Sequence, residues 1–403
     1  MKVLIIGGGA AGMAAAIEAA GNGHTVTVLE RQSRVGRKLA ATGNGRCNLT
    51  NENAAAEHYH GDPALAAAVL RRFSVEDTLR WFSGLGLYTV REPDGKYYPL
   101  SDRAACVVDT LRLAMDRLGV TVVCGCPVES VKKKARGWQA VAEDGTAYFG
   151  DRMIITCGGC AGSALGGTKS GYTLLASLGH SRTALHPVLV QLKTDAEPVR
   201  PLKGIRADAA LTLKDARGVL AQSAGEVQFT EFGVSGPAVF EISRAVSVGD
   251  TPMTLLLDLL RSRPEDALLS DLRHRLAVFP DLTAEMLLTG MLHPRLARAV
   301  LKAADVPADA VPQDETLPRI AHTLKYFPLT VLGTLGMEHA QVTAGGISAG
   351  EFRQDTLESR FAPGVFAAGE VLDVDGDCGG YNLQWAWSSG RLAGRLGQRG
   401  DDR

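Results

Sequence analysis

The fold is decided at the N-terminus by Lys2-Val3-Leu4-Ile5-Ile6-Gly7-Gly8-Gly9-Ala10-Ala11-Gly12. Its first apolar residues form a β-branched and leucine-rich run, typical of a buried parallel strand. Residues 13–20 are rich in alanine and are predicted to be helical, and residues 25–29 form a second predicted strand that Glu30 closes. The glycine spacing G-x-G-x-x-G, set between a strand and a helix, therefore predicts a βαβ unit of about thirty residues.

Each residue of this unit has a physical role in binding a dinucleotide. Gly7 permits the tight turn out of the strand, and Gly9 lets the backbone approach a pyrophosphate. Ala10 and Ala11 complete the motif and are expected to contact the cofactor. The N-terminus of the following helix presents free N–H groups to the phosphates, and Gly12 lets that helix pack closely on the sheet. Glu30 follows Gly12 by 18 residues, where a carboxylate accepts hydrogen bonds from ribose hydroxyls and disfavours a 2′-phosphate. We therefore expect a dinucleotide site rather than a structural glycine turn.

The strands predicted after the first βαβ unit indicate whether the dinucleotide is FAD or NAD. Further predicted strands at 120–123, 151–156 and 364–368 return late in the chain, and the last two end in glycines. No second G-x-G-x-x-G is present in the sequence, so no separate NAD(P)H domain is expected. This order predicts an α/β fold: an FAD-binding, Rossmann-like, doubly wound three-layer domain that carries an inserted domain.

The domain boundaries follow from the same pattern. We place the FAD-binding domain at residues 1–185 and 341–403, with a helical cap at about 55–90. Residues 186–340 form the insert on the substrate side. Its first part, 186–259, alternates apolar and polar residues like antiparallel strands, and 264–304 has helical periodicity. Phe232, Ser235 and Pro237 of the insert, with Tyr381 opposite, are candidates for the substrate cleft.

Four separated motifs carry a family resemblance. They are RKL at 37–39 with TGNGRCNLTN at 42–51, GEVQFT at 225–230 with GVSGPA at 233–238, AQVTAGG at 340–346, and GEVLD at 369–373 with GGYNLQWA at 379–386. With these motifs the whole chain resembles the HI0933-type (YhiN/BaiN-like) NAD(P)/FAD-dependent oxidoreductases. The resemblance implies a non-covalent FAD and a substrate-side insert, and it fixes the cofactor far better than the substrate.

The resemblance also implies which residues contact FAD. Residues 42–51 run along the flavin in this family, Val128 matches the position that meets the adenine, and a helix beginning near residue 382 would point its N-terminus at the flavin pyrimidine, where it stabilises negative charge. Beyond the first unit, the implied contacts are Arg37, Lys38, Thr42, Gly43, Asn44, Gly45, Arg46, Cys47, Asn48, Val128, Gly158, Gly369, Glu370, Gly380, Tyr381, Asn382 and Leu383. No catalytic acid or base can be named, and no metal site is expected.

The composition indicates which kinds of binding partner and which cellular compartment to expect. Lys and Arg number 43 against 44 for Asp and Glu, so bulk charge favours neither a nucleic acid nor an anionic membrane. The 7 cysteines form no disulfide framework, and no apolar stretch is long enough to span a membrane, so we expect a cytoplasmic protein with a small-molecule substrate. Cys47 is expected to be a buried thiol, and Cys157 with Cys160 is not expected to be a redox pair. Oligomeric state is left open.

Three functions remain open from the sequence. The first is NAD(P)H-dependent reduction of an activated C=C bond, such as that of an enone or a 3-oxo bile acid or steroid, with hydride transfer through flavin N5 and with the nicotinamide binding only transiently. The second is oxidation of a small amine, such as aminoacetone, by oxygen, which needs no nicotinamide site. The third is a flavin-binding module without turnover. The sequence favours the reductase.

Overall fold

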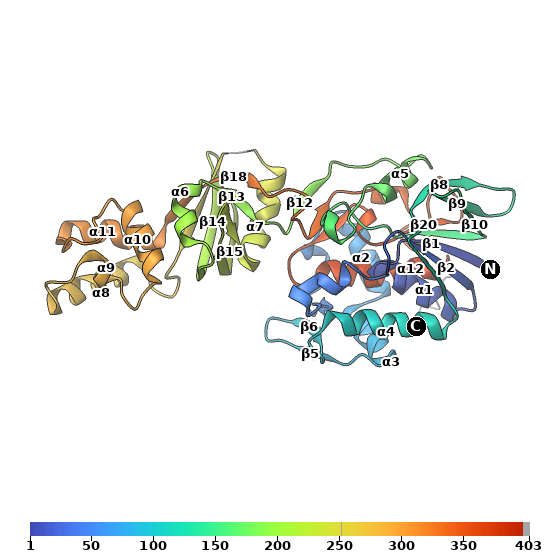
Figure 1. The fold of residues 1–403 in the computed structure, drawn as a ribbon, viewed down its shortest axis with the longest axis horizontal. Coiled ribbons are helices and arrows are strands. Elements are labelled where there is room, and N and C mark those ends of the chain that lie inside the picture. Colours follow the sequence, from blue (N-terminus) through green and yellow to red (C-terminus); the bar gives the residue numbers. More distant parts are fainter. Residues whose placement is uncertain (251, 398–403) are drawn as a thin grey trace. The chain divides into compact units, whose positions relative to one another are not determined.

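The computed structural model describes residues 1–250 and 252–397. The chain divides into two compact units (Figure 1). The split unit consists of Met1–His186 and Gln341–Arg403, and the inserted unit consists of Pro187–Ala340.

A five-stranded parallel sheet is the centre of the split unit. Its strand order is β20-β11-β1-β2-β7, and every neighbouring pair is parallel. Because β1 lies in the middle, the chain crosses to both sides of it, which is the doubly wound arrangement predicted from the sequence. The strands are β1 (Lys2–Ile6), β2 (Thr25–Glu30), β7 (Thr121–Cys124), β11 (Arg152–Ile155) and β20 (Val365–Ala367).

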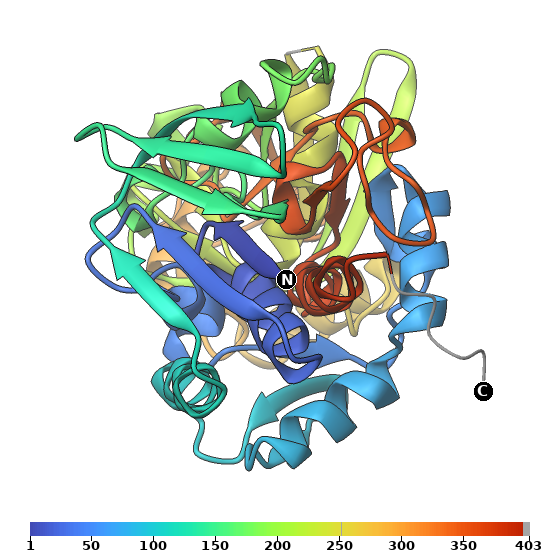
Figure 2. The same cartoon turned by 90° about the vertical axis from the view of Figure 1, so that its right-hand side faces the viewer.

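Layers cover the two faces of this sheet. Helix α1 contacts β1, β2, α4 and α12, while β10 of a three-stranded antiparallel sheet contacts β1 (Figure 2). The helices of this layer are α1 (Ala10–Gly21), α4 (Ala104–Arg117) and α12 (Tyr381–Gly394), and the antiparallel strands are β8 (Val128–Lys133), β9 (Trp138–Ala142) and β10 (Ala147–Gly150). Val3, Leu4, Ile5 and Ile6 are at most 4% exposed, so the apolar run read as a buried strand is the core of the unit.

The remaining elements of the split unit lie outside the parallel sheet. The segment 55–90, predicted as a helical cap, is helical in α2 (Pro63–Arg72), in α3 (Val75–Gly84) and in a short 3-10 helix at Ala56–His58. It also contains β4 (Tyr59–Gly61), which pairs with the distant β21 (Val374–Gly376), so a long-range ladder replaces helix there. The other elements are β3 (Thr50–Asn51), β5 (Thr89–Arg91), β6 (Lys96–Pro99), α5 (Ser170–Ala176) and β19 (Val342–Ala344).

The inserted unit is a closed six-stranded barrel with helices. The barrel order is β13-β16-β15-β14-β17-β18. Two features differ from the prediction: helix α7 interrupts the stretch read as strands, and β18, which follows the helical stretch, closes the barrel by pairing with both β13 and β17. The unit contains β13 (Leu192–Thr194), β14 (Arg206–Asp215), β15 (Gly218–Phe229), β16 (Gly233–Ser235), β17 (Met253–Asp258), β18 (Phe327–Thr334), α6 (Ala196–Val199), α7 (Pro237–Val248), α8 (Glu265–Val278), α9 (Ala284–Leu287), α10 (Pro294–Ala303) and α11 (Leu317–Lys325); β12 (His186–Val188) lies at the boundary of the two units.

Alternating side chains fill the barrel. Leu211 and Leu213 of β14 and Leu255 and Leu257 of β17 are at most 1% exposed, which is the period-2 burial of a strand with one face inward. In the part of the chain that the structure describes, no helix has the length and apolar character needed to cross a membrane.

Candidate functional site

Three glycines shape the turn between β1 and α1. Gly7 has a φ of +105°, and a Cβ there would lie 2.5 Å from the carbonyl oxygen of Thr156. A Cβ at Gly12 would lie 1.9 Å from the carbonyl oxygen of Gly7, so only glycine lets the helix approach the turn this closely. At Gly9, in contrast, no described atom lies within 4 Å of the added Cβ. This open space adjoins the N-terminus of α1, which no side chain caps, as an anion site requires.

Glu30 is held rigidly at the end of β2. Its Oε2 accepts a hydrogen bond from the Gly8 N–H at 2.7 Å, and its Oε1 accepts one from the Gln32 N–H at 2.7 Å. Because each carboxylate oxygen has a further lone pair, the group can still accept from ribose hydroxyls. The Cys126 N–H donates to the backbone carbonyl of Glu30 at 2.9 Å, and Cys126 precedes Val128, the first residue of β8, by two residues.

Further glycines lie at the same edge of the parallel sheet. Gly158 follows β11 with a φ of +71°, and Gly369 follows β20 with a φ of +76°. A Cβ at Gly369 would lie 2.9 Å from the Cβ of Ala11, so this turn contacts the first turn of α1. The carboxyl ends of three adjacent strands, β20, β11 and β1, therefore end in glycine turns, and this edge is where ligands bind in open α/β sheets.

The loop after β2 has an irregular backbone. In the short helix at Leu39–Gly45 and just beyond it, φ is positive at Gly43 (56°), Asn44 (54°), Gly45 (85°) and Cys47 (63°). Thr42 donates to the Leu39 carbonyl at 2.7 Å. Such a segment exposes backbone groups instead of pairing them in a helix or sheet.

Asn48 ends this loop with an unsatisfied polar atom. Its Oδ1 is buried and has no hydrogen-bond partner among the described residues. A Cβ at Gly380 would lie 2.9 Å from the same atom, so the loop and the start of α12 meet at Asn48. A buried acceptor without a donor is costly in a finished site, and a bound ligand with an N–H group would satisfy it.

The three cations expected near the ligand differ in their surroundings. Lys38 forms an ion pair with Glu370 at 2.9 Å, and the other oxygen of Glu370 accepts from the Thr343 N–H at 2.8 Å. Arg37 is exposed and donates to Gln32 at 2.6 Å. Arg46 binds two carboxylates and lies 4.0 Å above the Tyr98 ring; hydrogen bonds to Glu92 and Asp102 raise the pKa of its guanidinium. The charge of Arg46 is therefore already compensated within the protein.

The N-terminus of α12 is built on glycine. Gly380 has a φ of +104°, and a Cβ there would lie 2.7 Å from the carbonyl carbon of Thr50. No side chain caps the helix. The Asn382 side chain accepts from the Gly376 N–H at 2.8 Å and donates to the Gly376 carbonyl at 2.7 Å, so it fixes the preceding turn, and only its backbone remains for a ligand. Leu383 is half-buried on the same first turn.

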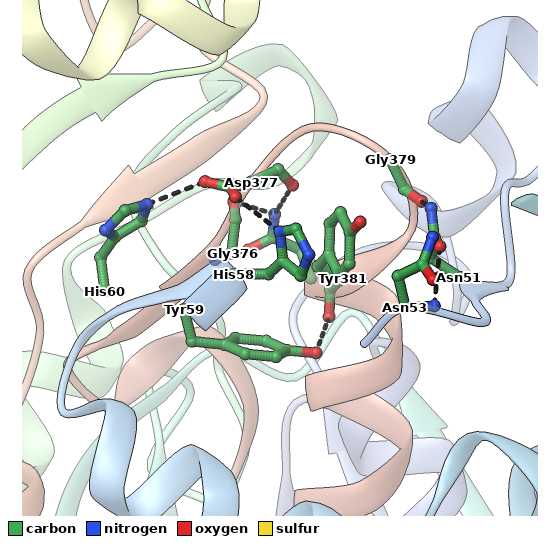
Figure 3. Close-up of polar contacts among 10 residues, drawn as sticks. Asn51, Asn53, His58, Tyr59, His60, Gly376, Asp377, Gly379 and Tyr381 are labelled. Atoms are coloured by element: carbon green, nitrogen blue, oxygen red, sulfur yellow. Dashed lines mark hydrogen bonds and ion pairs between the residues drawn. The ribbon is translucent and has the colours of Figure 1, made fainter. Parts of the chain in front are cut away.

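Sequence reasoning missed a polar cluster beside this helix start (Figure 3). Asp377 bridges two imidazoles: its Oδ2 lies 3.0 Å from His58 Nδ1 and its Oδ1 lies 2.8 Å from His60 Nε2. The His58 ring stacks on the ring of Tyr381, with centroids 4.4 Å apart and planes 17° apart. Tyr59, between the histidines in sequence, donates from its hydroxyl to the Tyr381 carbonyl at 3.0 Å.

The pairing of β4 with β21 explains why the cluster could not be foreseen. His60 is paired with Asp375, and Tyr59 is paired with Gly376, although more than 300 residues separate the two strands in sequence. Burial alone would raise the pKa of Asp377, but hydrogen bonds from His60 and His58 outweigh it and hold that pKa below its usual value. In the sequence, the cluster is indicated only by the spacing of His58 and His60. Residues two positions apart have their side chains on the same face where the chain is extended.

Comparison with models of protein families shows the family of this chain. The model for the HI0933-like protein Rossmann domain matches residues 1–396. The chain belongs to the HI0933-like family. It is an FAD-dependent oxidoreductase, as the motifs predicted.

Two named relatives are similar to the chain in sequence, and a solved structure is similar to it in fold. The 3-dehydro-bile acid delta(4,6)-reductase of Clostridium scindens is 41% identical over 404 residues, which cover 98% of each chain. The ribosomal RNA dihydrouridine synthase of Escherichia coli is 29% identical over 96% of this chain and 95% of the relative. The 3-ketosteroid-delta4-(5alpha)-dehydrogenase of Rhodococcus jostii RHA1 shares the fold, with a TM-score of 0.52 and 18% identity over 98% of this chain and 95% of that one.

The residues of this HI0933-like protein fit an FAD group. Open space at Gly9 beside an uncapped helix, the unpartnered Asn48 Oδ1, and the oriented Glu30 carboxylate each match one part of a flavin dinucleotide: pyrophosphate, ring and ribose. They all lie in the split unit.

Among the described residues of the HI0933-like chain, no two cysteines are joined by a disulfide. Cys47 is completely buried, and burial raises the pKa of its thiol to about 12. Burial likewise raises the pKa of the Cys157 thiol to about 12. A thiol that stays protonated at neutral pH is a poor nucleophile, so the structure offers no activated cysteine at these positions.

The three residues of the inserted unit that were predicted to line the substrate cleft differ in solvent exposure. Phe232 is 58% exposed and Pro237, the first residue of α7, is also exposed, whereas Ser235 is buried in β16. Phe232 is therefore not part of the barrel core, and Ser235 is only 7% exposed.

Proposed function

We propose that this protein reduces a C=C bond conjugated to a ketone, in a 3-oxo bile acid or steroid-like molecule, with NAD(P)H as the donor. The observation that carries the proposal is the 41% identity, over 98% of both chains, to a 3-dehydro-bile acid delta(4,6)-reductase. Reduction is favoured over amine oxidation because that relative is named a reductase.

The split unit would bind FAD through three sets of residues. The uncapped start of α1 and the open space at Gly9 would receive the pyrophosphate, and Glu30 would receive the ribose hydroxyls. The start of α12 would place its free backbone N–H groups and positive dipole end against the flavin ring, with Asn48 beside it. When bound, FAD would supply hydride chemistry, accepting two electrons from a nicotinamide and passing them to carbon.

An anaerobic titration tests the proposal. NADH and NADPH are added separately to the purified flavoprotein, followed by an enone such as a 3-oxo-4-ene steroid. We expect one nucleotide to bleach the flavin absorbance and the enone to restore it. Flavin that both nucleotides leave oxidised, with hydrogen peroxide released from small amines, would instead support the oxidase.

The relationship to ribosomal RNA dihydrouridine synthases offers a second substrate for the same chemistry. Uridine also contains a C=C bond next to a carbonyl, but the inserted unit has 16 Lys and Arg against 19 Asp and Glu, without the excess of positive charge that RNA binding favours. We therefore propose a small molecule rather than RNA. Undiminished reoxidation by an enone in the presence of excess ribosomal RNA is the expected result.

A further inference from the structure

We propose that His58, oriented by Asp377, donates the proton that completes reduction of the substrate double bond. The proposal rests on the proposed function and adds the acid that it leaves unnamed. It follows from the geometry of the polar cluster at the start of α12 (Figure 3).

Two contacts fix the plane of the His58 ring. Asp377 accepts from Nδ1, and the ring lies flat against Tyr381, the first residue of α12. The Asp377 N–H also donates to the His58 carbonyl at 3.0 Å, so backbone and side chain join the same two residues. His60 shares the carboxylate but stacks on no described ring, so its orientation is less constrained.

The bond to Asp377 decides which nitrogen is used. A carboxylate that accepts from Nδ1–H leaves Nε2 as the nitrogen that gains and loses a proton. The structure shows no hydrogen-bond partner for His58 Nε2 among the described residues, and the side chain is 30% exposed. Water can therefore reprotonate the ring after each turnover.

The proton balance of the reaction requires such a group. The donor supplies a hydride, whose electron pair forms the new C–H bond at the β-carbon, and the π electrons move toward the α-carbon and ketone. The Nε2–H bond of the His58 imidazolium then breaks as the α-carbon gains its proton, and the ring is left neutral. The net change is NAD(P)H plus one proton added to the C=C bond, giving NAD(P)⁺ and the saturated product.

A proton donor must also lie close to the flavin ring, where the substrate is reduced. His58 stacks on the residue that begins α12, and the start of that helix is the part of the split unit expected to face the flavin ring. Asp377 and His60 act through His58 and are positioning residues. Tyr59, whose pKa burial raises, holds the Tyr381 carbonyl and is not an acid at neutral pH.

Separating the two half-reactions tests the assignment. Enzyme reduced anaerobically by NAD(P)H, or by dithionite, is mixed with the enone while flavin absorbance is followed. In His58→Asn and His58→Gln, reduction by NAD(P)H should stay within about twofold of wild type, while reoxidation by the enone should slow by roughly 10²–10⁴-fold. Asp377→Asn should slow reoxidation at least tenfold, because it loses the carboxylate that orients the ring. FAD affinity, measured by fluorescence quenching, should not change in any of them.

Two controls separate chemistry from structure. His274→Asn, an exposed histidine of α8, should behave as wild type in both half-reactions. Added imidazole should restore reoxidation in His58→Ala and not in Asp377→Asn, because only the former leaves a space for it.

Several outcomes would overturn the assignment. Wild-type reoxidation in His58→Asn, or equal loss of FAD affinity and of both half-reactions, would show that His58 is not the acid. If dithionite-reduced wild type is not reoxidised by any enone, the proposed function fails, and the role of His58 fails with it.

Discussion

Gly9 and Gly12 lie three residues apart in one turn, and their surroundings are opposite. A side chain at Gly12 would collide with the Gly7 carbonyl, whereas one at Gly9 would enter open space. Packing of α1 on the sheet therefore explains the glycine at position 12, and we propose that the open space at Gly9 serves a ligand.

Alanine substitutions should separate these roles. Gly12→Ala should lower the free energy of unfolding of the apo-protein by about 1–3 kcal/mol through overpacking. Gly9→Ala should change it by less than about 0.5 kcal/mol, yet weaken FAD binding at least tenfold, because the methyl group fills the pyrophosphate space. Urea unfolding and FAD fluorescence titration measure the two quantities. Equal effects of the two variants on stability would contradict this reading of the turn.

The buried thiol of Cys47 gives a prediction that depends on pH. Because burial raises its pKa to about 12, thiolate is scarce at every pH below that value, and reactivity should rise only as pH approaches it. Iodoacetamide applied to the native protein at pH 8 should therefore leave Cys47 unmodified while it labels the exposed Cys124. Peptide mass spectrometry measures both in one sample, and unfolding in urea should make Cys47 reactive.

Site residues were predictable where the chemistry is local. Gly7, Gly12 and Glu30 have the geometry that their spacing implied, because a strand, a turn and a helix follow one another in sequence. The spacing did not predict that Arg46 binds Glu92 and Asp102, or that the Asn382 side chain fixes a turn. Those partners are brought together only by folding.

At the scale of elements, α1 and α12 pack against each other in the split unit. A Cβ at Gly390 would lie 2.4 Å from the Ala11 carbonyl oxygen, so small residues let the backbones approach. Glu18 of α1 binds Arg391 of α12 at 2.5 Å, and the guanidinium lies 4.0 Å above the Phe73 ring. The side chains of Glu18 and Arg391 are 12% and 17% exposed.

Breaking this ion pair should be costly. Glu18→Ala should lower the free energy of unfolding by about 3 kcal/mol, because it leaves the guanidinium buried without its main partner. The double variant Glu18→Leu with Arg391→Met should lose less than the single variant, because it removes the buried guanidinium together with its partner. The charge that remains is on Arg395, which also pairs with Glu18 and is 29% exposed. Arg80→Ala, in an ion pair with Asp77 where Arg80 is 68% exposed, serves as the control and should cost less than about 1 kcal/mol. Urea denaturation of all three variants measures these differences.

The elements themselves were predictable to the extent that their pairing is local. The βαβ unit and the late return of β11 and β20 to one sheet follow from apolar runs that end in glycine. The pairing of β4 with β21, and the closure of the barrel by β18, did not follow, because residues of ordinary composition meet only after long intervening segments.

At the scale of the whole molecule, the two units have separate cores. The buried cluster of the inserted unit is drawn entirely from residues 192–331. All the residues expected to bind FAD lie in the split unit.

FAD should therefore stabilise one unit and not the other. Calorimetry should resolve two unfolding transitions, and FAD at about one hundred times its dissociation constant should add about 2.7 kcal/mol to the split unit alone. Gly9→Ala should abolish that shift without moving the second transition. A single transition that FAD shifts as a whole would contradict the independence of the units.

The strands of the central sheet come from both sides of the inserted unit in sequence. The ribosome therefore makes four of them before the inserted unit and the fifth after it. Strands β1, β2, β7 and β11 leave the exit tunnel first, but β20 and α12 follow only after Pro187–Ala340 has been made. At about 5–20 residues per second, synthesis of the inserted unit takes roughly 8 to 31 seconds. During it, the alanine-rich face of α1 that α12 covers has no partner, and the barrel can close before the sheet is complete. Until α12 has been made, the nascent chain therefore exposes an apolar surface to which a chaperone can bind, and the site proposed for FAD lacks the start of that helix.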